Sequence, residues 1–214
     1  MTISAEVAQS LLQIKAIKLS PQNPFTWASG MQSPIYCDNR ILLSYPAIRN
    51  TVVEALTTTS KQFESFDLVA GVATAGIAHG ALLAHTIEAP FVYVRSAAKS
   101  HGRQNLIEGH LKGTEKVLVI EDLISTGGSS LKAVEAVRER GCEVVGVLAI
   151  FSYGFEKASQ AFEAANCPLI TLSNYKTLIQ EALDNQYITE SDFELLERWR
   201  ENPENWQTNL NTAH

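Results

Sequence analysis

Short, almost wholly apolar runs recur along the chain, and stretches in which apolar residues follow a helical period separate them. Such runs are typical of strands buried on both faces of a sheet, and they cover residues 67–72, 91–94, 116–120, 142–151 and 169–172. The helical stretches cover about residues 5–16, 46–58, 76–86, 129–140, 156–166, 176–185 and 190–202. Strands that alternate with helices of this length predict right-handed βαβ units, a parallel sheet and the α/β class.

Several residues predict where individual elements begin and end. Ser4 is a candidate N-cap for the first helix, Pro46 suits the first turn of the second, and Gly141 suits the position just after a helix end. Residues 25–38 predict two short extended pieces around the turn Ser29-Gly30. Because no internal repeat or interdomain linker is found, we expect a single domain over residues 1–214.

The most informative segment follows the apolar run at 117–120, where Glu121 and Asp122 precede a loop rich in Ser, Thr and Gly. Ligands of parallel sheets bind at the carboxyl ends of strands, and a glycine-rich helix N-terminus there suits a phosphate. No Lys follows the glycines, so the loop is not a Walker A motif. Two carboxylates beside a phosphate site suit a sugar phosphate, because they can accept hydrogen bonds from vicinal hydroxyls. The alternative at this point is a polar strand end followed by a well-capped helix.

The segment Arg95–Gly109 has no clean period and is longer than most loops of compact domains. Residues 95–116 hold five basic residues against two acidic ones, a net charge of +3. This pattern favours a lid that closes over a polyanion, although a solvated surface loop has the same composition.

Composition narrows the class of protein further. The 214 residues carry a net charge of −6, and all of this excess lies from Glu181 onward, so binding to nucleic acid is not expected. Cys37, Cys142 and Cys167 are far apart and form no zinc-ligand pattern, which is typical of reduced cytosolic thiols. Residues 68–87 lack charged side chains, but their glycines, threonines and histidines predict a buried strand and helix rather than a membrane span. No signal peptide is evident, and we expect a cytoplasmic protein.

The acid pair and its loop resemble the phosphoribosyl-pyrophosphate signature of the type I phosphoribosyltransferases. The resemblance implies that family's fold, a mostly parallel sheet flanked by helices, with a core at about 46–172. It also implies a small hood from residues of about 1–45 and from C-terminal helices at about 173–214. It implies that this sugar diphosphate binds to Glu121, Asp122, Leu123, Ile124, Ser125, Thr126, Gly127, Gly128 and Ser129.

The spacing Arg95, Lys99, His101-Gly102 and the segment 25–34 resemble the orotate phosphoribosyltransferases within that family. The resemblance implies transfer of ribose 5-phosphate to orotate in pyrimidine biosynthesis. It also implies Mg²⁺ as the cofactor, and no residue of the protein is assigned as a direct ligand of the metal. It implies catalytic roles for Arg95, Lys99, His101 and Asp122, of which the first three contact the diphosphate. Ser125 is implied to contact orotate, residues 73–76 are similar to the family's diphosphate-side loop, and a homodimer is implied.

The sequence departs from some branches of the family at Ala28, Ala75 and Ser96, where those branches have lysines. Fewer cations would therefore meet the two anionic substrates, and the partner of the orotate carboxylate stays open. Two other functions also stay open at this point. One is a phosphoribosyltransferase for another nucleobase, and the other is a non-catalytic regulator that senses the sugar diphosphate.

Overall fold

The computed structural model describes residues 1–27, 30–97, 106–203 and 206. Its central sheet has the strand order β10-β9-β8-β5-β6-β7, and all neighbours are parallel except β6 and β7. The strands are β5 (Leu68–Val72), β6 (Phe91–Val94), β7 (Ile107–Glu108), β8 (Lys116–Ile124), β9 (Glu143–Ser152) and β10 (Leu169–Asn174). The predicted α/β class with a mostly parallel sheet is confirmed.

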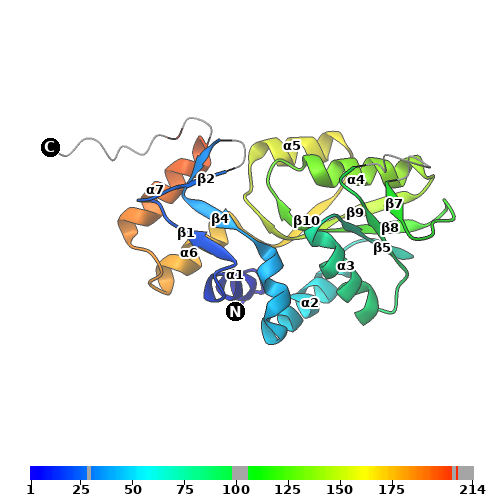
Figure 1. Ribbon diagram of the computed structural model, residues 1–214, viewed down its shortest axis with the longest axis horizontal. Coiled ribbons are helices and arrows are strands. Elements are labelled where there is room, and N and C mark those ends of the chain that lie inside the picture. The colour runs from blue at the N-terminus through cyan, green and yellow to red at the C-terminus, as the bar shows by residue number, and fades with distance from the viewer. Residues whose placement is uncertain (28–29, 98–105, 204–205, 207–214) are drawn as a thin grey trace.

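Helices cover both faces of this sheet (Figure 1). On one face lie α2 (Pro46–Ser60) and α3 (Ala75–Thr86), and on the other lie α4 (Gly128–Glu139) and α5 (Glu156–Ala164). Each face has its own buried apolar cluster. One contains Leu56, Leu83, Leu118 and Ile120, and the other contains Val119, Val137, Val147 and Phe162. Burial on both faces explains why these strands are nearly continuous apolar runs.

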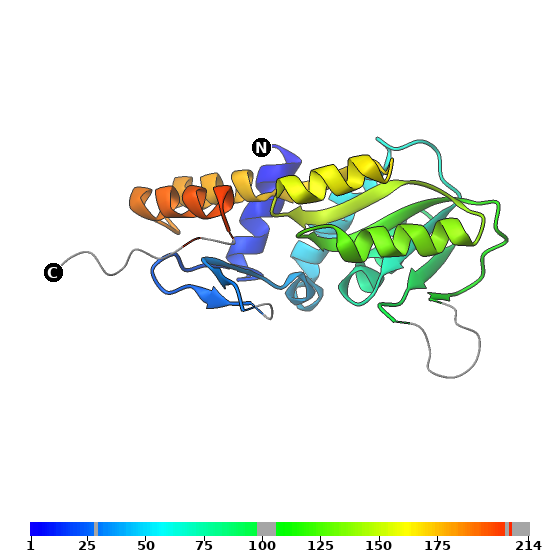
Figure 2. The same ribbon diagram turned by 90° about the horizontal axis from the view of Figure 1, so that it is seen from above.

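The N-terminal elements and the last two helices lie together at one end of the described fold, in a part that we call the hood (Figure 1 and Figure 2). It comprises α1 (Ile3–Gln13), β1 (Ile17–Leu19), β2 (Phe25–Thr26), β3 (Gln32–Ser33), β4 (Ile35–Cys37), α6 (Tyr175–Asp184) and α7 (Glu190–Glu201). β1 pairs with β4 and β2 with β3, both antiparallel. The 3₁₀ helix η1 (Asn39–Ser44) then leads from the hood into α2.

An aromatic cluster joins the hood to the sheet. Trp199 of α7 is fully buried. The centroid of its ring lies 5.6 Å from the ring centroid of Phe155 and 6.0 Å from that of Trp27. Tyr153, which directly follows β9, packs against Trp27 at 5.2 Å. The hood is therefore fixed beside the carboxyl ends of the strands, where ligands of parallel sheets bind.

Four local expectations need correction. Thr2 rather than Ser4 caps α1, because its hydroxyl accepts the N–H of Ala5 at 3.2 Å. The predicted strand 116–120 continues through both acids to Ile124, since β9 offers pairing partners as far as Ser152. The segment 95–109, which was expected to be a loop throughout, contains the short strand β7 near its end. The strand β1 was not predicted from the sequence.

The charge-free stretch 68–87 forms β5 and α3, as predicted. Within the described ranges, none of the helices combines the length and apolar character that a bilayer-spanning segment needs.

Candidate active site

The acid pair lies where the carboxyl ends of β5 and β8 meet the start of η1. Glu121 and Asp122 line a cavity of about 310 Å³ together with Cys37, Asp38, Arg40, Ala73, Thr74, Ala75, Leu123 and Ser129. The peptide bond between Ala73 and Thr74 is cis. Two segments that resembled family motifs, 73–76 and 121–129, are thus neighbours in space.

Gly76 allows this close approach. A Cβ atom built on Gly76 would lie only 2.5 Å from the carbonyl oxygen of Ile120, which is too close for any side chain. The first turn of α3 therefore packs directly on the backbone of β8 beside the acids.

Glu121 is buried, with 4% of its surface exposed, and its carboxyl group is held by α4. Ser130 donates its hydroxyl to Oε2 at 3.0 Å, and the N–H of Asp122 donates to Oε1 at 3.1 Å. Burial and the neighbouring charge of Asp122 raise the pKa of Glu121 to about 8. This side chain therefore keeps its proton, and can donate a hydrogen bond, to a higher pH than an ordinary glutamic acid does.

The raised pKa of Glu121 predicts a pH-dependent stability. Between the unfolded value of about 4.3 and the folded value of about 8, the folded state binds more protons, so the free energy of unfolding falls as pH rises. Glu121→Gln cannot ionise and removes this dependence. As pH rises from 5 to 8.5, we expect the free energy of unfolding to fall by at least about 2 kcal/mol more for the wild type than for the variant. Urea unfolding at each pH measures this difference. Parallel pH profiles for the two proteins would contradict the assignment.

Asp122 is half-buried and is positioned through its backbone. Asn39, which is fully buried at the start of η1, donates its side-chain N–H to the carbonyl oxygen of Asp122 at 2.7 Å. Across the same cavity, Arg40 makes a two-pronged contact with Asp38 at 2.6 and 2.9 Å, which lowers the pKa of Asp38. His79 of α3 is fully buried nearby, and burial lowers its pKa, so it is neutral at pH 7.

The N-terminus of α4 lies at the end of the loop for which the sequence predicts an anion site. Gly127 occupies the N-cap position with φ of +82° and supplies no side-chain cap, so the first N–H groups of the helix stay open to a ligand. Ser125 and Thr126 line a further cavity of about 580 Å³ between this loop, the segment after β9 and the end of α7.

Gly127 and Gly128 differ in what an added methyl group would meet. A Cβ on Gly127 would lie 2.8 Å from the ring of Phe162 at a positive φ, whereas nothing lies within 4 Å at Gly128. We expect Gly127→Ala to lower the free energy of unfolding by about 1–3 kcal/mol, against less than about 0.5 kcal/mol for Gly128→Ala. Urea unfolding of both variants measures the difference, and equal effects would contradict this account of the loop.

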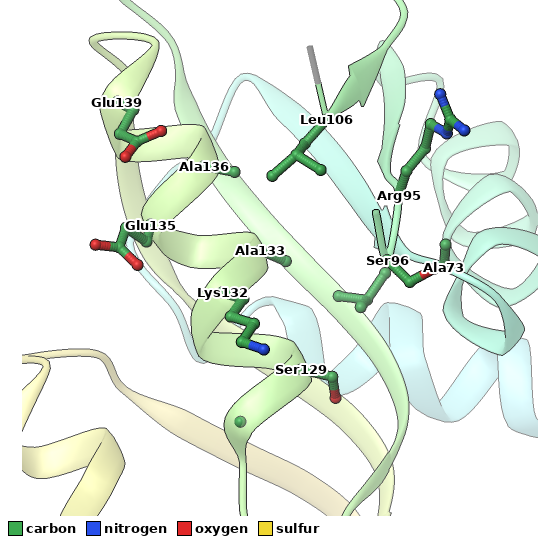
Figure 3. A pocket seen from close by; sticks show the side chains of 12 residues that line it. Ala73, Arg95, Ser96, Leu106, Ser129, Lys132, Ala133, Glu135, Ala136 and Glu139 are labelled. Carbon is green, nitrogen blue, oxygen red and sulfur yellow. The ribbon is translucent and has the colours of Figure 1, made fainter. Parts of the chain in front are cut away.

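Arg95 lies beside a second cavity, which adjoins that of the acids. Its guanidinium is 3.6 Å from the carboxylate of Glu108, and it lines this second cavity of about 480 Å³ beside α4 with Ser96, Leu106 and Lys132 (Figure 3). In Figure 3 its side chain points away from α4. Ala73 and Ser129 line both cavities, so the two adjoin, and Arg95 lines only the one beside α4. Lys99 and His101 lie outside the described residues.

Sequence reasoning missed several residues of the site. Asp38, Asn39 and Arg40 stand in no recognisable motif, and they reach the acids only through the path of η1. Lys157 and Arg200 line the cavity of Ser125 from α5 and α7, and no local pattern singles them out.

Comparison with known proteins places the chain in a family. Residues 40–186 match the model of the phosphoribosyl transferase domain. The orotate phosphoribosyltransferase of Listeria monocytogenes serotype 4b (strain F2365) is 54% identical over 207 residues, which are 96% of this chain and 99% of that one. The chain belongs to the orotate phosphoribosyltransferase family. It is therefore a transferase enzyme, and the family predicted from residues 25–130 is confirmed.

Solved structures of the family share the fold. Orotate phosphoribosyltransferase from Aeropyrum pernix superposes with a TM-score of 0.75 at 27% identity, covering 86% of this chain and 99% of that one. The enzyme from Mycobacterium tuberculosis H37Rv in complex with 5-phospho-alpha-D-ribosyl 1-diphosphate superposes with a TM-score of 0.64 at 25% identity. The match covers 82% of this chain and 98% of that one. The fold and the sequence thus assign the same family.

Proposed function

We propose that this enzyme transfers ribose 5-phosphate from 5-phosphoribosyl 1-diphosphate to orotate, in a Mg²⁺-dependent step of pyrimidine biosynthesis. The observation that carries the proposal is the acid pair Glu121-Asp122 near the carboxyl end of β8, which a short loop connects to the open N-terminus of α4. In the reaction, the bond from ribose C1 to the diphosphate oxygen breaks, and its electron pair leaves with diphosphate. A ring nitrogen of orotate bonds to C1 and gives up its proton to water or to the released diphosphate, and the product is orotidine 5′-monophosphate.

The described residues fit the charges of this reaction. The backbone N–H groups of residues 125–129, at the start of α4, bind the 5′-phosphate, and the hydroxyl of Ser125 contacts orotate. Asp122 accepts hydrogen bonds from the ribose hydroxyls and stabilises the positive charge that builds up on the ring. Glu121, as a neutral acid, donates a hydrogen bond to a ribose oxygen or, once ionised, accepts one. The 73–76 loop faces the diphosphate.

Magnesium suits this site as an ion carried mainly by substrate oxygens. Among residues 1–27, 30–97, 106–203 and 206, no group of three His, Cys, Asp or Glu side chains is placed to hold a metal ion. Mg²⁺ commonly binds through one or two carboxylates, phosphate oxygens and water, and Asp122 faces the cavity with the oxygen ligand that this ion prefers. When bound, the ion neutralises charge that develops on the leaving diphosphate.

We also propose a homodimer in which the segment that carries Lys99 and His101 reaches the partner's site. Membership of the orotate phosphoribosyltransferase family supports this arrangement. Arg95, at the start of the segment, lies 3.6 Å from Glu108 of its own chain. The N–H of Arg95 donates to the carbonyl oxygen of Leu106 at 2.8 Å, so the segment between them leaves and returns at one place.

An ultraviolet assay with orotate, the sugar diphosphate and Mg²⁺ tests the proposed reaction. We expect orotate absorbance to fall with time, and we expect a chelator of divalent cations to stop the change. Parallel reactions with adenine, hypoxanthine and uracil provide the comparison. Turnover of one of these bases without orotate, or binding of the sugar diphosphate without turnover of any base, would overturn the proposal.

A further inference from the structure

The cavity lined by Ser125 offers a place for the base next to the phosphate loop. Its volume of about 580 Å³ lies between Ser125 and Thr126 of that loop, Met31 of the hood, Phe155 after β9, Lys157 of α5 and Arg200 of α7. Different parts of the fold thus meet around one space.

Orotate differs from uracil by a carboxylate on its planar ring, so a site that selects orotate needs a cation near the base. Two cations near the site are already engaged by carboxylates. Arg40 is bound by Asp38 through two contacts, and Arg95 lies against Glu108. Lys132 lines the cavity of Arg95, which does not contain Ser125.

Lys157 and Arg200 approach the Ser125 cavity from two sides. Arg200 donates one N–H of its guanidinium to the carbonyl oxygen of Gly154 at 3.3 Å, which places this group over the loop that follows β9. A guanidinium has five N–H donors, so further donors remain for a ligand. The carboxylates of Glu156 and Glu201 also line the cavity, and that of Glu156 accepts a hydrogen bond from Gln160 along α5 at 2.9 Å.

The start of α5 adds positive potential and a flat wall. Phe155 is the N-cap residue and supplies no side-chain hydrogen bond, so the N–H groups of Glu156 and Lys157 remain at the positive end of the helix. The ring of Phe155 is stacked on that of Tyr153, with centroids 5.5 Å apart and planes 23° apart. A half-buried, fixed aromatic ring suits contact with a planar base.

We infer that Arg200 and Lys157 bind the carboxylate of orotate, with Phe155 against the ring and Ser125 as a polar contact. This inference rests on the proposed function. It assigns selectivity for the acidic pyrimidine to the hood helix α7 and to the first turn of α5. Arg200 and Lys157 would also supply positive charge that this chain lacks at Ala28, Ala75 and Ser96, where some branches of the family have lysines.

Orotidine 5′-monophosphate and uridine 5′-monophosphate provide the test, because they differ only by this carboxylate. Calorimetric titration measures the dissociation constant of each nucleotide for the wild type, Arg200→Gln and Lys157→Gln. We expect each variant to bind the orotidine nucleotide at least about tenfold more weakly, while binding of the uridine nucleotide changes by less than about twofold. Arg200→Lys should recover part of the affinity.

Arg198→Gln is the matched control, because Arg198 lies on the same helix and faces Glu194 at 3.9 Å rather than the cavity. Equal losses for both nucleotides, or no loss for either, would overturn the inference. If Arg200→Gln lowers the unfolding temperature, Lys157→Gln is the variant that tests the inference, because Lys157 is exposed. The same selective loss of affinity for the orotidine nucleotide is expected of it. Failure of the proposed function itself gives a different result, since the wild type would then show no turnover of orotate.

Discussion

Asp122→Asn is expected to lower kcat by about a hundredfold or more while the fold stays intact. Asparagine has the same shape and keeps an oxygen that can accept a hydrogen bond from a ribose hydroxyl. It lacks the negative charge that stabilises the positive ring as the bond to diphosphate breaks. The main loss should therefore fall on kcat, with a smaller rise in KM for the sugar diphosphate.

Steady-state kinetics with both substrates varied measures this effect, and thermal unfolding checks the fold. Because the contact from Asn39 goes to the backbone oxygen of Asp122, the substitution leaves the position of the β8 end unchanged. Glu143→Gln is the control, since Glu143 is exposed at the opposite end of the sheet, at the start of β9. If Asp122→Asn kept kcat within about threefold of the wild type, Asp122 would have no part in stabilising charge in the transition state.

The parts of the fold that follow from local periodicity were predictable. β5 is buried at all five positions, and such a strand has to be apolar throughout, so the sequence shows it directly. Gly127 and the acid pair belong to one contiguous run of residues, so the phosphate loop was also recognisable from the sequence alone. In these segments one stretch of the chain forms the whole feature.

The remaining features depend on contacts between distant segments. Asn39 holds Asp122 across 83 positions of sequence, and Arg200 reaches Gly154 across 46. β1 has only three residues and pairs with β4, so its burial pattern is too short to show a period. The raised pKa of Glu121 likewise depends on burial under α4, which the pair Glu-Asp alone does not reveal. Local pattern therefore predicts elements and motifs, while the electrostatics of the site needs the tertiary structure.

Lys99→Ala is expected to lower kcat by more than about tenfold, with little change in the free energy of unfolding. The leaving diphosphate gains negative charge as its bond to ribose breaks, and a lysine brought over it by the lid stabilises that charge. Lys99 lies outside the described residues, in a segment whose two ends are held together by the hydrogen bond from Arg95 to Leu106. Steady-state kinetics measures the loss, and a kcat near that of the wild type would contradict the lid role.

Mixed dimers test whether the lid acts at the site of its own chain or at the site of the partner. When a Lys99→Ala chain and an Asp122→Asn chain are co-expressed with different tags, the isolated heterodimer has one intact lid and one intact acid pair on different chains. If the lid acts on the partner, these two meet in one site, and we expect about half the wild-type activity per dimer. If it acts within its own chain, both sites carry a defect and activity stays as low as in the parent variants.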